Sequence, residues 1–204
     1  DQQHSDFVSN FIKEDKNMVG WDVIANRWND KFKSISSHLL NLSKNQKIPD
    51  DHINYLKKLK NEGFEPKVIY DIGSCVLHWT NEAKKIWPEV KIILFEAMEE
   101  AEFLYKDYDY FIGVLSDEDN KEVKWFQNEI EPAGNSYYRE TYNKKSEELF
   151  PENGFKNRKT SKLDTIIKER KYPLPDLIKI DTQGSELDIL NGSSEALKNI
   201  KYLI

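Results

Sequence analysis

Two carboxylates stand in or at the end of short apolar runs in the middle of the chain. Asp71 lies in the run 67–72, and Gly73 follows directly after that run. Glu96 is the last residue of the run 91–96. In an open α/β sheet, a glycine turn after one strand lets the backbone approach a ligand, and an acidic residue ending the next strand accepts hydrogen bonds from ribose hydroxyls. The pattern predicts a site for an adenosine-containing ligand. The residues expected to bind it are Asp71, Gly73, Ser74, Glu96 and Ala97.

The turn that follows Asp71 contains one glycine. A dinucleotide fingerprint has three, and Leu77 stands where the third is expected. Because a pyrophosphate needs several free backbone N–H groups at close approach, a ligand without phosphate suits this turn better. S-adenosylmethionine, an adenosine that carries a sulfonium and an amino-acid tail, meets that requirement. The alternatives are an NAD(P)-dependent oxidoreductase on a similar sheet and a nucleotide-binding or scaffold domain without turnover.

Further polar side chains follow predicted strands or the glycine turn. Asp117 follows one strand and is a candidate acceptor for the adenine amino group, or a turn residue. Asp181 follows another strand and is a candidate for removing a proton from the second substrate, the acceptor, or for orienting it. Its alternative role is an N-cap of the next helix. Glu186 either belongs to the same catalytic site as Asp181 or stabilises the N-terminus of the helix through its negative charge. His78 is a candidate base, or a packing residue at a helix start.

Strands and helices alternate from residue 66 onward. Such alternation gives a mainly parallel sheet with right-handed crossovers, a Rossmann-like α/β fold. The predicted strands are 67–72, 91–96, 110–115, 177–180 and the start of a fifth at 202–204. The predicted helices between them are 80–87, 99–105, 163–170 and 186–190. Residues 123–127 alternate like an antiparallel strand, and residues 129–160 form a long polar excursion of the kind that carries function or is mobile.

Residues 1–62 show helical spacing without a convincing strand. They are predicted to form an N-terminal helical extension to a Rossmann-like domain that spans residues 63–204. Trp21, Trp28 and Leu39 belong to an apolar stripe with helical spacing, and we expect this stripe to pack on the main domain. The chain lacks an initiator Met and stops inside a predicted strand. We therefore expect a domain trimmed from a longer protein, with its C-terminal strands missing.

The bulk composition restricts the class of protein and its partners. The 204 residues hold 30 Lys+Arg and 36 Asp+Glu, a formal net charge of −6, which argues against a nucleic-acid partner because such proteins present a basic face. Cys75 is the single cysteine, so no intrachain disulfide forms and a cytoplasmic location is expected. No apolar run reaches the roughly 18 residues of a membrane span. Asp181 and Glu186 are oxygen donors of the kind that bind Mg²⁺, but no cluster has metal-ligand spacing, so no metal is expected. The oligomeric state stays open.

Four stretches carry a family resemblance. They are residues 63–73, which lead into the glycine turn; Phe95-Glu96-Ala97; Gly134-Asn135-Ser136; and residues 163–166 with 178–192. Together they resemble the FkbM-type family of S-adenosylmethionine-dependent methyltransferases, and the last stretch is the most distinctive. The resemblance covers about residues 50–204. Leu77 stands where the family usually has glycine, and Gln183 stands where Glu is common.

The resemblance implies a class I methyltransferase fold and methyl transfer to an oxygen, typically a hydroxyl of a sugar or another small metabolite. It also implies that Asn135, Ser136 and Gln183 face this small-molecule or saccharide acceptor. The methyl donor is already activated, so the enzyme mainly aligns the hydroxyl within about 3–3.5 Å of the methyl carbon. It also helps to remove the hydroxyl proton. The candidates for this chemistry are Asp181, Glu186 and His78.

Overall fold

A parallel sheet of five strands lies at the centre of the molecule. The computed structural model describes residues 21–204, and their side chains from residue 28 onward. The strands are β1 (Val68–Ile72), β2 (Lys91–Glu96), β3 (Asp109–Ile112), β7 (Leu177–Ile180) and β8 (Tyr202–Leu203). They pair in the order β3-β2-β1-β7-β8, and every pairing is parallel. Each of these strands falls within or close to a predicted apolar run.

Burial on both faces explains why these segments form strands. β1 is buried along its whole length and β2 along most of it, as expected for parallel strands covered on both sides. After β1 the chain adds β2 and β3 on one side, and it later crosses to the other side to add β7 and β8. This reversal of strand order leaves a crevice at the carboxyl ends of β1 and β7, where ligands of open α/β sheets bind.

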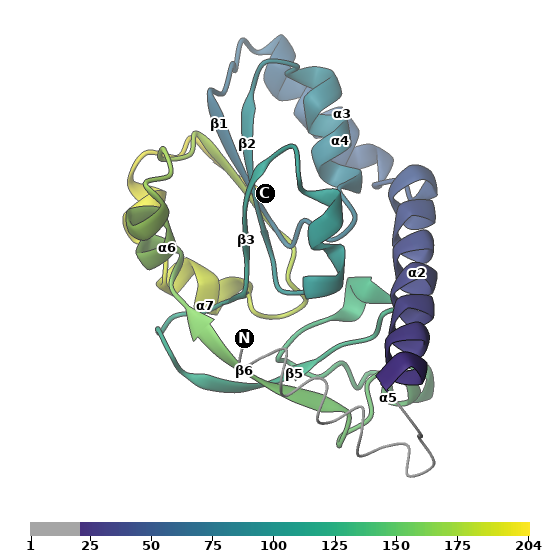
Figure 1. Ribbon diagram of the computed structural model, residues 1–204. Helices are drawn as coiled ribbons and strands as arrows, with labels where there is room; N and C mark the ends of the chain where they lie inside the picture. The colour runs from purple at the N-terminus through teal and green to yellow at the C-terminus, as the bar shows by residue number, and fades with distance from the viewer. Residues whose placement is uncertain (1–20) are drawn as a thin grey trace.

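Helices cover both faces of the large sheet (Figure 1). Those on one face share a buried apolar core and are α3 (Asp50–Asn61), α4 (His78–Ile86) and the 3₁₀ helix η1 (Glu99–Leu104). Those on the other face enclose a second core and are α6 (Leu163–Arg170), α7 (Glu186–Asn191) and η3 (Ala196–Lys198). The three layers confirm the predicted Rossmann-like α/β fold.

A second, small sheet lies beyond the carboxyl ends of the large one, in the lower part of Figure 1. Its strands are β4 (Val114–Leu115), β5 (Glu122–Phe126) and β6 (Phe155–Ser161). β5 pairs antiparallel with β6, so the predicted antiparallel strand is confirmed. The prediction of one strand over 110–115 is wrong, because the chain leaves the large sheet before Gly113 and enters the small one after it.

The segment 129–160 is more structured than its sequence indicates. It contains η2 (Pro132–Gly134), α5 (Lys144–Leu149) and most of β6. β6 was missed because it is largely exposed and rich in Lys, Asn and Arg. Hydrophobic alternation, the main sequence signal of a strand, is therefore absent. Pairing with β5 makes this segment a strand, and that pairing is a long-range property of the fold.

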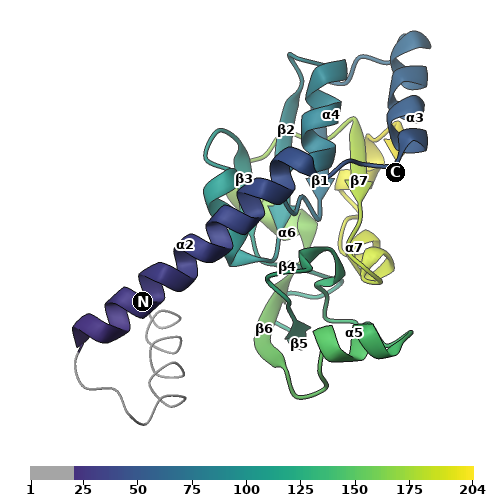
Figure 2. The same cartoon turned by 90° about the vertical axis from the view of Figure 1, so that its right-hand side faces the viewer.

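The helix α2 (Trp21–Asn45) lies along one side of the molecule, beside η1 (Figures 1 and 2). Its second half packs as predicted, since Leu39 is fully buried and Ile35 contacts the same core. Trp28 and Phe32 stack with their ring centroids 5.9 Å apart and are 37% and 43% exposed. The predicted packing on the main domain is thus confirmed for the second half of the helix and not for this pair. Residues 1–20 of the predicted extension, and the side chain of Trp21, lie outside the described residues.

Polar contacts tie α2 to the segment 129–160. His38 Nε2 lies 2.9 Å from the carbonyl oxygen of Ile130, and Lys31 Nζ lies 3.7 Å from the Glu129 carboxylate. α2 therefore holds the first part of that segment against the domain. Although α2 has 25 residues, neither it nor another helix within residues 21–204 combines the length and the hydropathy of a membrane span.

Docking of α2 should depend on Leu39. Leu39→Ala should lower the free energy of unfolding by about 2–5 kcal/mol, because it leaves a cavity where a fully buried side chain stood. The adjacent Leu40 is 41% exposed and is the matched control. Leu40→Ala should change the free energy of unfolding by less than about 0.5 kcal/mol. Urea denaturation followed by circular dichroism measures both, and equal losses would contradict docking through Leu39.

Candidate functional site

A cavity of about 250 Å³ opens at the carboxyl ends of β1, β2 and β7. The cavity wall brings together predicted site residues from four separate parts of the chain. They are Gly73, His78, Glu96, Ala97, Asn135, Asp181 and Gln183. The other predicted site residues do not line it, namely Asp71, Ser74, Asp117, Ser136 and Glu186.

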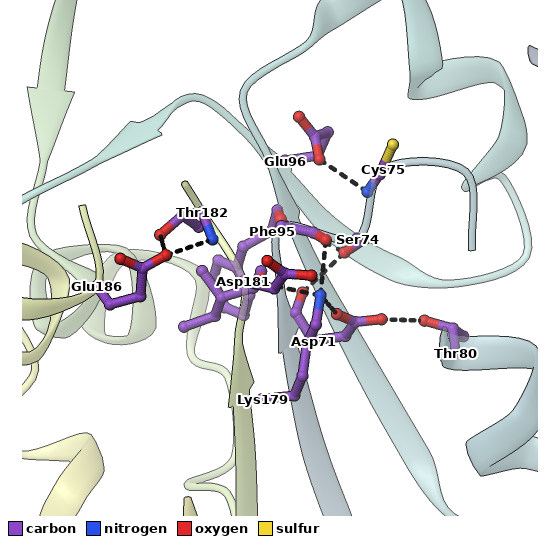
Figure 3. A network of polar contacts seen from close by, with 12 residues as sticks. Asp71, Ser74, Cys75, Thr80, Phe95, Glu96, Lys179, Asp181, Thr182 and Glu186 are labelled. Carbon is purple, nitrogen blue, oxygen red and sulfur yellow. Dashed lines mark hydrogen bonds and ion pairs between the residues drawn. The ribbon is translucent and has the colours of Figure 1, made fainter. Parts of the chain in front are cut away.

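Glu96 ends β2 with its carboxylate held by three backbone N–H groups. Oε2 accepts from Cys75 at 2.8 Å, and Oε1 accepts from Ala97 and Met98 at 2.8 Å each. Figure 3 shows the bond to Cys75. Burial raises the pKa of Glu96, whereas the N–H donors and the Lys179 ammonium oppose the rise. These donors fix the direction of the carboxylate and favour its charged form at the cavity wall.

The turn after β1 passes repeatedly through the left-handed backbone region. Gly73, Cys75 and Leu77 have φ angles of 74°, 46° and 68°. A β-carbon at Gly73 would lie 2.0 Å from the carbonyl oxygen of Asp181, so only glycine lets the ends of β1 and β7 meet this closely. Leu77 adopts a left-handed conformation, which explains why glycine is expected at its position.

Most of the polar backbone of this turn is already engaged. The N–H groups of Gly73 and Ser74 both donate to the carbonyl oxygen of Phe95, and that of Cys75 donates to Glu96. A pyrophosphate needs several free N–H groups at close approach. The geometry of the turn therefore argues against the NAD(P)-dependent alternative.

Asp71 lies beneath the turn rather than in the cavity wall. It is fully buried, and its Oδ2 accepts from Thr80 Oγ1. Its Oδ1 lies 3.0 Å from Nζ of Lys179 on β7, an ion pair that is not aligned as a hydrogen bond (Figure 3). Lys179 is also buried and donates to the carbonyl oxygen of Gly73. Both Asp71 oxygens thus have protein partners, and its predicted contact with a ligand stays a prediction.

Asp181 presents an exposed carboxylate to the cavity, where its Oδ1 accepts from Gln183 Nε2 at 3.1 Å. The alternative role as an N-cap is wrong, because α7 begins at Glu186 and the residue directly before it holds the N-cap position. The Glu186 carboxylate accepts from the N–H groups of Thr182 and Gly184, at 2.9 Å each. Glu186 therefore shapes the loop that carries Asp181 (Figure 3).

Two residues of the cavity wall, His78 and Cys75, have pKa values shifted in opposite directions. His78 begins α4, and its Nδ1 is buried without a hydrogen-bond partner among the described residues. Burial, followed by the charge of Lys179, lowers the pKa of His78 below 6.5, so the ring is neutral near pH 7. Burial, followed by the charge of Glu96, raises the pKa of Cys75 to about 12. The Cys75 thiol stays protonated and is not a nucleophile.

Three predicted residues outside the cavity have structural partners. Ser74 Oγ donates to the carbonyl oxygen of Asp71 at 2.7 Å. Ser136 is buried and pairs through its backbone with β5. Asp117 lies 3.3 Å from Lys121 Nζ, in the connection between β4 and β5, which agrees with the alternative role of a turn residue.

Other parts of the cavity wall come from residues that the sequence does not single out. The connection between α2 and α3 lies beside the strand ends, and no local pattern predicts this. Tyr137 follows Asn135 and Ser136 closely and donates to the Asp188 carboxylate of α7 at 2.8 Å. The additional lining residues of most interest are Gln46, Lys47, Ile48, Pro49, Trp125 and Tyr137.

The described part of the chain contains no group of three His, Cys, Asp or Glu side chains placed to hold a metal ion. The oxygen donors weighed for Mg²⁺ are Asp181 and Glu186. They face different partners, because Asp181 lines the cavity and Glu186 binds backbone N–H groups of its own loop.

Gly73→Ala should destabilise the protein more than Gly63→Ala. Both glycines have positive φ angles, 74° and 85°, so alanine is strained at each position, at a cost of about 1–2 kcal/mol. A β-carbon at Gly73 also clashes with the Asp181 carbonyl, whereas one at Gly63 meets nothing within 4 Å. The clash should add about 1–3 kcal/mol. Urea denaturation measures the difference, and equal losses would show that the strand ends separate at no cost.

The comparison with protein families agrees with this geometry. The model of the methyltransferase FkbM domain matches residues 68–204, about two thirds of the chain. No curated protein matches the chain significantly. The matched segment runs from β1 to the end of β8 and so contains every strand found within residues 21–204, the glycine turn, Glu96 and Asp181. The chain belongs to the FkbM methyltransferase family.

Proposed function

We propose that this protein is an S-adenosylmethionine-dependent O-methyltransferase that acts on a hydroxyl of a sugar or a similar small metabolite. The observation that carries the proposal is Glu96, an acidic strand end held by three N–H donors at the wall of a cavity that it shares with Gly73 and Asp181. Membership of the FkbM family supports methyl transfer. The single cysteine fits a reducing, cytoplasmic location.

The ends of β1 and β2 fit an adenosine. Oε1 of Glu96 accepts two N–H groups and Oε2 accepts one, so Oε2 retains the lone pair for a ribose hydroxyl. Val114 and Leu115 add apolar surface to the same cavity and suit the adenine ring. When bound, S-adenosylmethionine supplies a methyl group that is activated by the adjacent sulfonium. Glu96 would hold the ribose at the end of β2 and so would orient the cofactor toward the rest of the cavity.

The other side of the cavity fits a hydroxylated acceptor. Asn135 and Gln183 carry amides that donate to and accept from hydroxyl groups. Asp181 is our first candidate for taking the hydroxyl proton, because the described residues give its Oδ2 no hydrogen-bond donor. His78 is the second, because its ring is neutral near pH 7 and its Nδ1 has no partner among the described residues. Either group would lower the barrier by taking the hydroxyl proton while the C–O bond forms and the C–S bond to the sulfonium breaks, with S-adenosylhomocysteine as the leaving group.

Titration calorimetry with S-adenosylhomocysteine, NAD⁺ and ATP, side by side, tests the choice of ligand. We expect binding of S-adenosylhomocysteine alone, since the N–H groups of Gly73, Ser74 and Cys75 in the turn after β1 are already engaged. Preferred binding of NAD⁺ supports the oxidoreductase instead. A scaffold domain without turnover is distinguished by transfer of a labelled methyl group from S-adenosylmethionine to sugar acceptors, which it does not perform.

Glu96→Ala should weaken the binding of S-adenosylhomocysteine by roughly 10- to 100-fold. The reason is the loss of a hydrogen bond between a charged carboxylate and a ribose hydroxyl, worth about 1.5–3 kcal/mol. Glu99→Ala is the matched control, because Glu99 starts η1 close by, is exposed and does not line the cavity. Calorimetry gives both affinities. Unchanged affinity in a folded Glu96→Ala protein would remove the ribose assignment.

Asp181→Asn should slow methyl transfer by roughly 10²–10⁴-fold and leave the affinity for S-adenosylhomocysteine almost unchanged. Asparagine keeps the shape and the hydrogen bonding of the side chain but does not take the proton. Asp117→Asn, in the connection between β4 and β5 and outside the cavity, should leave both quantities at the native level. Single-turnover transfer of a labelled methyl group measures the rate. A fully active Asp181→Asn enzyme would exclude Asp181 and leave His78 as the candidate base.

A further inference from the structure

A lysine is buried in the middle of an otherwise apolar strand. Lys179 belongs to β7, is 5% exposed and lies in register beside Asp71 of β1, which is fully buried. Its Nζ is 3.0 Å from Asp71 Oδ1. Burying two charges costs free energy that a well-packed apolar pair avoids. The pair therefore needs an explanation other than the packing of the sheet.

The lysine ammonium also binds the backbone of the glycine turn. Nζ lies 2.8 Å from the carbonyl oxygen of Gly73 and 3.3 Å from that of Ile72. The ammonium thus donates to these two carbonyl oxygens and forms an ion pair with Asp71. Lys179 does not line the cavity, and its interactions are directed at the end of β1.

From this turn the contacts continue to the end of β2. The N–H groups of Gly73 and Ser74 donate to the carbonyl oxygen of Phe95, at 2.9 and 3.2 Å. The N–H group of Cys75 donates to Glu96 Oε2 at 2.8 Å. Figure 3 shows the ion pair, the turn and Glu96 in one network. A single cation on β7 is thus connected through the turn to the carboxylate at the end of β2.

We propose that Lys179 is a positioning residue for the cofactor. It holds the glycine turn in the conformation in which Gly73 clears Asp181 and the Cys75 N–H orients Glu96. Lys179 does not touch the cofactor and acts through the turn. This inference rests on the proposed function, because it takes Glu96 as the ribose-binding carboxylate.

The test separates this role from the stability of the fold. Lys179→Met alone leaves Asp71 as an unpaired buried charge, which is strongly destabilising. The decisive protein therefore combines Lys179→Met with Asp71→Asn, which removes both charges and keeps an oxygen for Thr80 Oγ1. Its reference is Asp71→Asn alone, in which Lys179 keeps both carbonyl partners and the asparagine amide oxygen replaces the carboxylate as its third acceptor. The control combines Lys91→Met with Asp109→Asn, which removes an exposed ion pair of 2.7 Å from the same sheet.

Two readouts are compared in these proteins. Calorimetry should show the double variant binding S-adenosylhomocysteine at least about tenfold more weakly than Asp71→Asn, because the turn loses charge-assisted hydrogen bonds. Amide hydrogen exchange, followed by NMR, should show faster exchange by about tenfold or more at Gly73, Ser74 and Cys75. Protection within β1, at Ile69, should stay as it is. The Lys91 and Asp109 control should match the native protein in both readouts.

Equal affinities in the double variant and Asp71→Asn would overturn the inference, and so would unchanged exchange at the turn. The exchange measurement needs no ligand. A native protein that does not bind S-adenosylhomocysteine therefore refutes the proposed function, while exchange still decides whether Lys179 holds the turn. If the double variant does not fold, Lys179→Arg provides the same two comparisons with the native protein, because it keeps the charge and redirects its donors.

Discussion

The close approach of the ends of β1 and β7 is the constraint on which the candidate site depends. Gly73 lies so near the backbone of Asp181 that a β-carbon would come within 2.0 Å of its carbonyl oxygen. This contact forces a left-handed turn at Gly73 and sets how far the two strands separate at the switch point of the sheet. Because the two ends meet there, the residues proposed for the cofactor and those proposed for the acceptor share one cavity.

Charged side chains lie both at the cavity wall and beneath the glycine turn. Asp71 and Lys179 form a buried pair beneath the glycine turn, and Glu96 receives backbone N–H groups at the cavity wall. Apolar side chains support the strands but have no preferred direction, whereas an ammonium with three partners fixes both the distance and the rotation of the segment that it binds. In the role proposed for Lys179, the pair orders the turn at the cost of desolvating two charges.

The two sides of the cavity have different origins in the chain. The wall that we assign to the cofactor comes from strand ends inside the segment that matches the FkbM domain. Another part of the wall comes from the connection between α2 and α3, which precedes that segment. α2 also holds the start of the segment 129–160 through His38, and α7 holds its middle through Tyr137. The cavity is thus completed by loops that are placed on a rigid sheet.

The sequence by itself determined the parallel sheet, the glycine turn and Glu96 at a strand end. Apolar runs and turn residues are local signals. A strand that is buried on both faces shows them clearly, because nearly all of its residues are apolar. Opposite charges in two such runs, Asp71 and Lys179, were visible too, but only the register of β1 and β7 made them a pair. β6, the split at Gly113 and the place of residues 46–49 were decided by the tertiary structure. They depend on partners far away in the chain, and such pairing leaves no periodic trace in the segment itself.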